Sequence, residues 1–212
     1  MKKGLLAILA LAVALTGFTQ NEKYTNAMKV NLGKFDSVKT ADEMLAVSAS
    51  FERIAEAEKT QWLPYYYAAL AEIFHAFMKN DAASNDNFAD KAEQLITKAE
   101  IISPNNSEIT CLKSWNATLR MIVNPSVRWQ QYGTVINSEL EKAKKLDPSN
   151  PRPYYLQGAN LRNTPENFGG GCAPAKPLLE EAMKKYEAFK PASELHPVWG
   201  KDQVQQMLAG CK

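Results

Sequence analysis

The chain has few of the residues on which metal and redox chemistry usually depends. Its 212 residues include only two histidines (His75, His196) and three cysteines (Cys111, Cys172, Cys211). No Cys-x-x-Cys or His-x-x-x-His pair occurs, so the close ligand spacing of structural zinc sites is missing. A zinc site built from Cys172, His196 and Cys211 is a weak alternative, and we predict that the protein needs no metal or other cofactor.

Catalytic motifs are equally scarce. His75 lies in the apolar run Ile73–Phe77, and His196 precedes a proline in a loop. Neither histidine accompanies a recognisable nucleophile and orienting group, which hydrolytic catalysis requires. The run Gly169-Gly170-Gly171 lacks the following Lys and Ser or Thr of a phosphate-binding loop and is read as a flexible turn. We therefore predict a protein that is not an enzyme.

The amino terminus has the pattern of an export signal. Met1-Lys2-Lys3 is basic, and the uncharged, mostly apolar run from Gly4 to Phe18 follows it. This run is shorter than the roughly 20 residues that span a membrane, which favours a cleaved signal peptide over residues 1–19 rather than an uncleaved anchor. No cysteine follows the run, which argues against a lipid anchor. We expect a periplasmic or secreted protein.

Without residues 1–19 the chain has no surplus of positive charge. The full sequence has 25 Lys and Arg against 23 Asp and Glu, and the predicted signal contains two lysines and no acid. Nucleic-acid binding requires a basic face, so we exclude a nucleic-acid partner. No later stretch approaches the length of a membrane span, and we expect no stable membrane span after signal removal.

Strand signals are nearly absent, and helical periodicity recurs along the chain. For example, Phe88, Ala92, Leu95, Ile96, Ala99 and Ile102 form one apolar stripe. Thr40 followed by Glu43 is typical of a capping box at a helix start. Nine helices are predicted: Tyr24–Phe35, Thr40–Lys59, Trp62–Met78, Phe88–Ile102, Ser107–Val123, Ser126–Leu146, Arg152–Arg162, Ala175–Phe189 and Trp199–Ala209.

A pattern of small and large apolar residues repeats through these helices. Its shared alanines, Ala57, Ala99, Ala143 and Ala182, are 42, 44 and 39 residues apart. The clearest unit, Leu140–Asn150 followed by Tyr154, Gly158 and Leu161, resembles the tetratricopeptide repeat, a helix–turn–helix unit of about 34 residues. Small residues at such positions let two helices approach closely.

The resemblance implies an all-α fold in which residues 20–212 form one domain. This domain would be a right-handed α-solenoid of antiparallel helix pairs, closed by a C-terminal capping helix. In this family the first helix of each pair lines a concave groove. Carried over by position, the groove residues that would contact a partner are Tyr66, Leu70, Phe74, Leu112, Trp115, Arg152, Tyr155 and Arg162. The competing interpretation is that these apolar side chains are core.

Export also bears on the cysteines. In an oxidising compartment an odd number of cysteines leaves one unpaired. Cys172 and Cys211 are expected at the surface near the last helix pair, so we predict a Cys172–Cys211 disulfide, which would stabilise the protein by roughly 3–4 kcal/mol. Three free thiols are the alternative. Cys111 lies on an apolar helix face and is expected to be buried.

Together these features predict an exported, non-enzymatic scaffold that binds a protein or peptide on its concave groove. The alternative is a periplasmic protein that binds a small ligand and serves a transporter. An open groove wide enough for a helix or strand would favour the first function, and an apolar pocket with a closed base and a few inward polar groups would favour the second.

Overall fold

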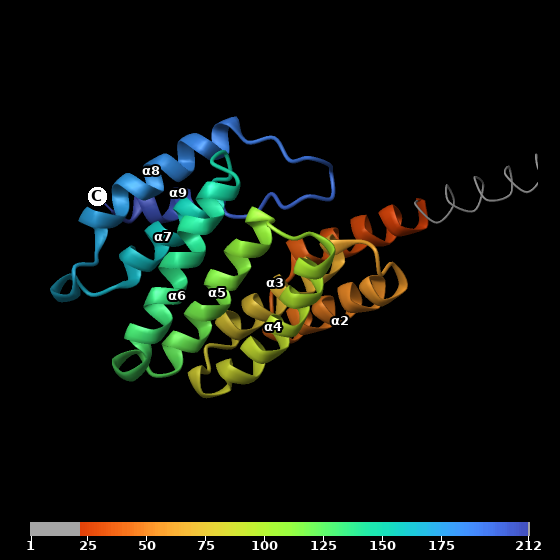
Figure 1. Cartoon of the computed structure of the whole chain (residues 1–212), viewed down its shortest axis with the longest axis horizontal. Coiled ribbons are helices and arrows are strands. Elements are labelled where there is room, and N and C mark those ends of the chain that lie inside the picture. Colours follow the sequence, from red (N-terminus) through yellow and green to blue (C-terminus); the bar gives the residue numbers. More distant parts are fainter. Residues whose placement is uncertain (1–21, 212) are drawn as a thin grey trace, which may run out of the picture.

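The computed structural model describes residues 22–211, which form helices joined by loops (Figure 1). The predicted signal peptide, residues 1–19, lies outside this range. The helical elements are residues 22–37, α2 (Ala41–Ala57), α3 (Trp62–Lys79), the 3₁₀ turn η1 (Ala82–Ser84), α4 (Asn85–Ile102), α5 (Ser107–Val123), α6 (Pro125–Leu146), α7 (Arg152–Asn163), the 3₁₀ turn η2 (Glu166–Phe168), α8 (Cys172–Ala188) and α9 (Lys201–Ala209).

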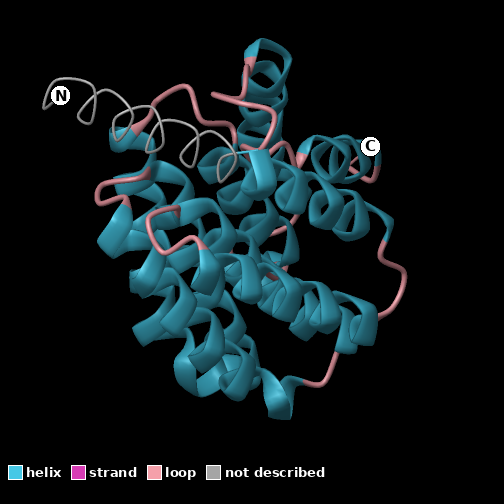
Figure 2. Cartoon of the chain, turned by 90° about the vertical axis from the view of Figure 1, so that its right-hand side faces the viewer, coloured by secondary structure: helices cyan, strands magenta, loops and turns pink. Residues whose placement is uncertain are grey.

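The all-α class is confirmed for this part of the chain. Residues 22–211 contain nine α-helices and no strand, and Figure 2 accordingly shows only helix and loop colours in this part of the chain. Each predicted helix overlaps one of the observed helices, although several ends differ by a few residues. Among these residues, no helix combines the length and apolar character needed to cross a membrane.

Local signals explain where several helices begin and end. The predicted capping box is present: the Glu43 N–H donates to Thr40 Oγ1 at 3.2 Å, and Glu43 Oε2 accepts from the Thr40 N–H at 3.2 Å. Asn106 caps α5 in a similar way, because its side-chain oxygen accepts from two backbone N–H groups of the first turn. These bonds satisfy donors that a helix start otherwise leaves without a partner.

Two predicted boundaries near the C-terminus are wrong. Trp199 was expected to open the last helix, but α9 starts at Lys201, because Gly200 has φ +110° and interrupts the helical backbone before it. The helix predicted from Ala175 starts three residues earlier, at Cys172, directly after Gly171 at φ +93°. Left-handed backbone of this kind is accessible mainly to glycine.

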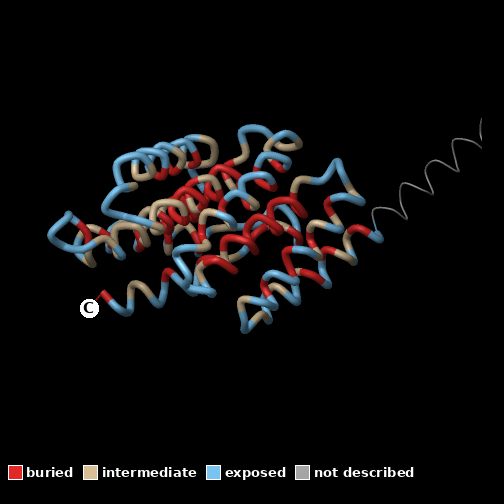
Figure 3. The backbone as a smooth tube through the Cα atoms, turned by 90° about the horizontal axis from the view of Figure 1, so that it is seen from below, coloured by how far each residue is buried: buried red, intermediate tan, exposed pale blue. Residues whose placement is uncertain are grey.

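The helices pack in sequence order. Each helix from α2 to α9 contacts the next one, and α3, α5, α7 and α9 also contact each other in turn. Figure 3 shows the result: buried backbone runs through the middle of the molecule, and exposed backbone surrounds it. Two apolar clusters form the core, one around α3 and one around α7 and α8, and Trp115 and Trp199 contact both.

Gly158 shows why the repeat pattern places a small residue in α7. It is buried, and a Cβ added there would lie 2.8 Å from Cδ2 and 2.9 Å from Cγ of Leu179 in α8. Only a residue without a side chain allows this approach of the two helices.

The predicted disulfide is confirmed. Cys172 at the start of α8 is bonded to Cys211 just after α9, with their Cα atoms 5.2 Å apart. Cys111 is free and fully buried in α5, as expected. The zinc alternative is wrong, because two of its three ligands are used in the disulfide. Among residues 22–211 no group of His, Cys, Asp or Glu could hold a metal ion.

Candidate functional site

Most of the predicted groove residues are buried. Tyr66, Leu70, Leu112 and Arg152 have no exposed surface, and Tyr155 is 5% exposed. Phe74, Trp115 and Arg162 are half-buried. The structure does bring side chains of α3, α5 and α7 to one face, but at that face they contact another part of the same chain.

The covering segment is residues 189–200, which we call the strap; it is the loop between α8 and α9 in Figure 1. The Trp199 ring stacks on Trp115 with centroids 5.1 Å apart, and its Nε1–H donates to the Tyr66 hydroxyl at 2.9 Å. The Tyr67 hydroxyl donates to the Leu195 carbonyl at 3.0 Å. The strap therefore fills the space in which a peptide was expected.

A buried ion pair between Arg152 and Glu108 contacts the strap. Arg152 donates to Glu108 Oε1 at 2.8 Å and to the carbonyl of Pro197 in the strap, and its guanidinium carbon lies 4.9 Å from the centroid of Trp199. Tyr66 donates to the other oxygen of Glu108. Burial raises the pKa of Glu108, and the charge of Arg152 opposes that shift. Arg152 therefore acts within the chain, where it joins α7 to α5 and to the strap.

Beside the strap lies a pocket of about 630 Å³, which we call the C-terminal pocket. Its walls come from the end of α8, the strap and the loop after α6, and its floor includes Glu108. The lining residues are Glu108, Asp147, Ser149, Glu181, Lys184, Lys185, Ala188, Phe189, Lys190, Ala192, His196 and Pro197. Sequence reasoning missed this pocket, and the signal that could have found it is the run of lysines at the end of a helix, followed by Phe189.

His196 is the one histidine that lines this pocket. Its Nδ1 lies 2.7 Å from the Ser193 hydroxyl, and the ring meets Trp62 edge-on at 5.7 Å. Burial lowers the pKa of His196 below its usual 6.5, which favours the neutral imidazole at neutral pH. The other histidine, His75, is 3% exposed, and its Nδ1 lies 2.7 Å from the Ala41 carbonyl oxygen.

A second pocket, of about 760 Å³, lies between helix 22–37 and α2. Its single aromatic lining residue is Tyr24, which is 7% exposed. Burial, with Glu58 nearby, raises the pKa of Tyr24 to about 12, so its hydroxyl is neutral. This pocket has no histidine, and its only aromatic ring is almost entirely covered.

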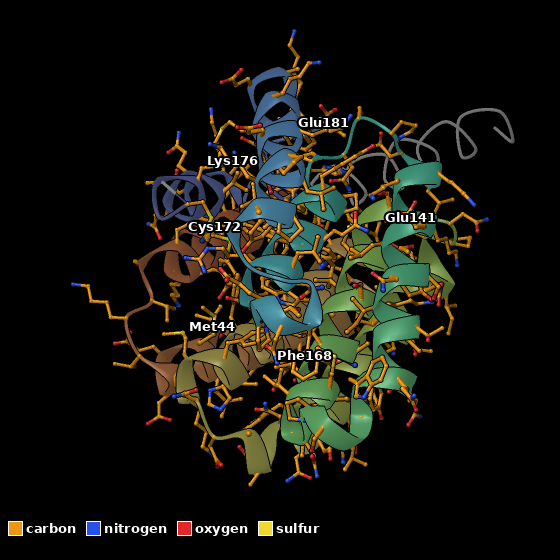
Figure 4. All side chains as sticks on the ribbon, turned by 90° about the vertical axis from the view of Figure 1, so that its left-hand side faces the viewer. Met44, Glu141, Phe168, Cys172, Lys176 and Glu181 are labelled. Carbon is orange, nitrogen blue, oxygen red and sulfur yellow. A yellow bond between two sulfur atoms is a disulfide. The ribbon has the colours of Figure 1, made fainter. Side chains whose placement is uncertain are left out.

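Exposed aromatic side chains also lie away from both pockets. Trp129 on α6 is 58% exposed, and Phe168 in η2 is 76% exposed. Figure 4 labels Phe168 in the loop that precedes α8. Neither residue lines either pocket.

Comparisons with known proteins give a match among solved structures. No protein-family model matches the chain, and a search of curated proteins finds no match. Among solved structures, the HusA haemophore from Porphyromonas gingivalis is 37% identical, with a TM-score of 0.80. The match covers 89% of this chain and 92% of that chain. Identity at this level over nearly the whole of both chains shows common descent, so the chain belongs to the family of the HusA haemophore.

Proposed function

We propose that this protein is an exported carrier that binds haem or a related porphyrin in the C-terminal pocket. The observation that carries the proposal is the family membership: a relative that matches 89% of this chain is a haemophore by name. The proposal replaces peptide binding as the preferred function and agrees with the small-ligand alternative drawn from the sequence.

The C-terminal pocket fits such a ligand in size and chemistry. Ligand pockets usually enclose about 300–1,000 Å³, and this one encloses about 630 Å³. Haem is a flat, largely apolar ring with two propionate groups. Phe189 and Pro197 supply apolar surface, lysines supply positive charge for carboxylates, and His196 is a candidate ligand for the iron.

Peptide binding on the concave face has less support. A peptide would have to displace the strap and with it the Trp199–Trp115 stack and the bond from Arg152 to Pro197. The predicted groove residues that are buried, such as Leu70 and Leu112, belong to the core of the protein. Their role in partner binding stays a prediction.

The remaining parts of the proposal concern architecture and location. Contacts between successive helices support a solenoid of the tetratricopeptide type, which we propose is right-handed. The disulfide fits a periplasmic or extracellular location, since such bonds persist in oxidising compartments. We propose that the protein acts by binding, without catalysis, and delivers its ligand to a transport system.

The test is a titration of residues 20–212 with haemin and with metal-free protoporphyrin IX. Binding is measured by the shift of the Soret band and by quenching of tryptophan fluorescence, since Trp62 and Trp199 lie near the pocket. We expect saturable binding with one ligand per chain. Absence of saturable binding of either porphyrin would refute the proposal.

Matched variants locate the site. Phe189→Ala removes an aromatic side chain from the lining of the C-terminal pocket, and Trp129→Ala with Phe168→Ala removes two exposed aromatic side chains outside it, on α6 and η2. We expect the first variant to weaken binding and the second to leave it unchanged. The reverse result would place the ligand on the α6 surface and show that the pocket assignment is wrong.

A further inference from the structure

We infer that the C-terminal pocket selects ligands with two free carboxylates, which Lys184 and Lys190 bind. This inference rests on the proposed function and adds to it a class of ligand and two specificity-determining residues. The basis is a comparison of the charged groups that line the pocket, of which some have partners within the protein and others do not.

Every acid that lines the pocket already has a donor. Glu108 accepts from Arg152, Asn150 and Tyr66. Asp147 accepts from the backbone N–H of Ser149 at 2.9 Å and from its hydroxyl at 2.6 Å. These carboxylates therefore have little need of a cation from a ligand.

Glu181 likewise pairs with Lys185, whose Nζ lies 3.2 Å from Glu181 Oε1 and donates to the Pro148 carbonyl at 2.8 Å. Lys185 also lies over the Tyr154 ring, at 4.5 Å from its centroid. Its ammonium group is used within the protein.

Lys184 and Lys190 differ from Lys185. Both line the pocket and are exposed, and neither forms an ion pair or a hydrogen bond with any residue between 22 and 211. The pocket lining thus combines two cations without partners with the apolar residues Phe189 and Pro197. A dianion with both charges on one edge of a flat apolar body complements this arrangement, and the two propionates of a porphyrin have that form.

The presence of lysines at this position also has an explanation that involves no ligand, and the test must distinguish it from carboxylate binding. Cations near the end of α8 interact favourably with the helix dipole, whether or not a ligand is present. Because the dipole affects stability and not ligand affinity, the binding assay separates the two explanations, and Lys176, an exposed lysine on the same helix outside the pocket, controls for non-specific attraction of a carboxylate. Figure 4 shows Lys176 near the Cys172 end of α8, with Glu181 further along the helix.

The experiment compares protoporphyrin IX with its dimethyl ester, which has the same ring and no free carboxylate. Both ligands are titrated, from matched solvent stocks, into the wild type, Lys184→Gln, Lys190→Gln, the double variant and Lys176→Gln. For the free acid we expect a loss of about two- to fivefold in affinity for each pocket lysine, as for an ion pair near the surface. The effect should shrink at high salt, because solvent-exposed charges are screened.

The ester distinguishes the two levels of the proposal. We expect it to bind more weakly than the free acid to the wild type, and equally well to the wild type and the double variant. If the free acid and the ester bind the wild type equally, or if Lys176→Gln costs as much as the pocket variants, the inference is wrong while porphyrin binding stands. If neither ligand binds the wild type, the proposed function itself fails.

Discussion

Gly158 provides a sharp test of how the helices pack. Gly158→Ala adds a methyl group that would lie 2.8 Å from Leu179 Cδ2 and 3.4 Å from the Leu179 backbone nitrogen. Alanine favours a helix over glycine by about 1 kcal/mol, but overpacking a core costs typically about 1–3 kcal/mol. Leu179 has no exposed surface and little room to move. We expect Gly158→Ala to lower the free energy of unfolding by about 1–2 kcal/mol.

Gly133 is the matched control for this substitution. It lies inside α6, and an added Cβ there meets nothing within 4 Å. Gly133→Ala should therefore raise the free energy of unfolding by about 0.5–1 kcal/mol. Urea unfolding followed by circular dichroism measures both variants, with unchanged m-values as the sign that only stability has changed.

The result that would refute the reasoning is equal stability of the two glycine variants. A third comparison isolates the contact. In a Leu179→Ala background the obstructing side chain is gone, so Gly158→Ala should become neutral or stabilising. Persistence of the full loss in that background would show that the Leu179 side chain is not its cause.

Three further predictions use the same unfolding assay. Cys172→Ser with Cys211→Ser should lower the free energy of unfolding by about 4 kcal/mol, and dithiothreitol should lower wild-type stability by a similar amount; no change with reductant would contradict this. Trp199→Ala should cost about 3–5 kcal/mol and make the strap a site of proteolysis, because its ring joins both core clusters; unchanged protease resistance would be inconsistent with a packed strap. Burial raises the pKa of Glu72 above its usual 4.5, against the bond from Ser48. The folded state then keeps this proton to a higher pH than the unfolded state does. The free energy of unfolding of the wild type should therefore fall relative to that of Glu72→Gln as the pH rises from the unfolded pKa of Glu72 through its folded pKa. A difference between the two proteins that stays constant from pH 4 to 7 would contradict this.

Sequence patterns predicted the helices and the disulfide because both have local or compositional causes. The Thr40–Glu43 capping box is fixed by residues three positions apart, and the Cys172–Cys211 bond follows from an oxidising compartment and nearby helix ends. The apolar faces of α3 and α5 were also found from their spacing. Periodicity shows which face of a helix is apolar.

Periodicity does not show what covers that face. The strap has no helical period, and its contacts join residues far apart in the sequence, such as Tyr67 with Leu195. Arg152 was assigned to an open groove from its position in the repeat, yet it is fully buried between Glu108 and the strap, which is rare for arginine. The C-terminal pocket depends on the same long-range contacts, so its lining could not be read from any single helix.

The disulfide also determines what the strap can do. It closes residues 172–211 into a covalent ring, and the strap is an arc of that ring, with α8 on one side and α9 on the other. A segment tethered in this way is present at its own binding surface at a high effective concentration, of the order of millimolar or more for short connections. A free peptide that binds the face covered by the strap would have to compete with this tethered segment. We therefore expect peptides of low affinity to be excluded from this surface. The same tether keeps the strap residues that line the C-terminal pocket in place.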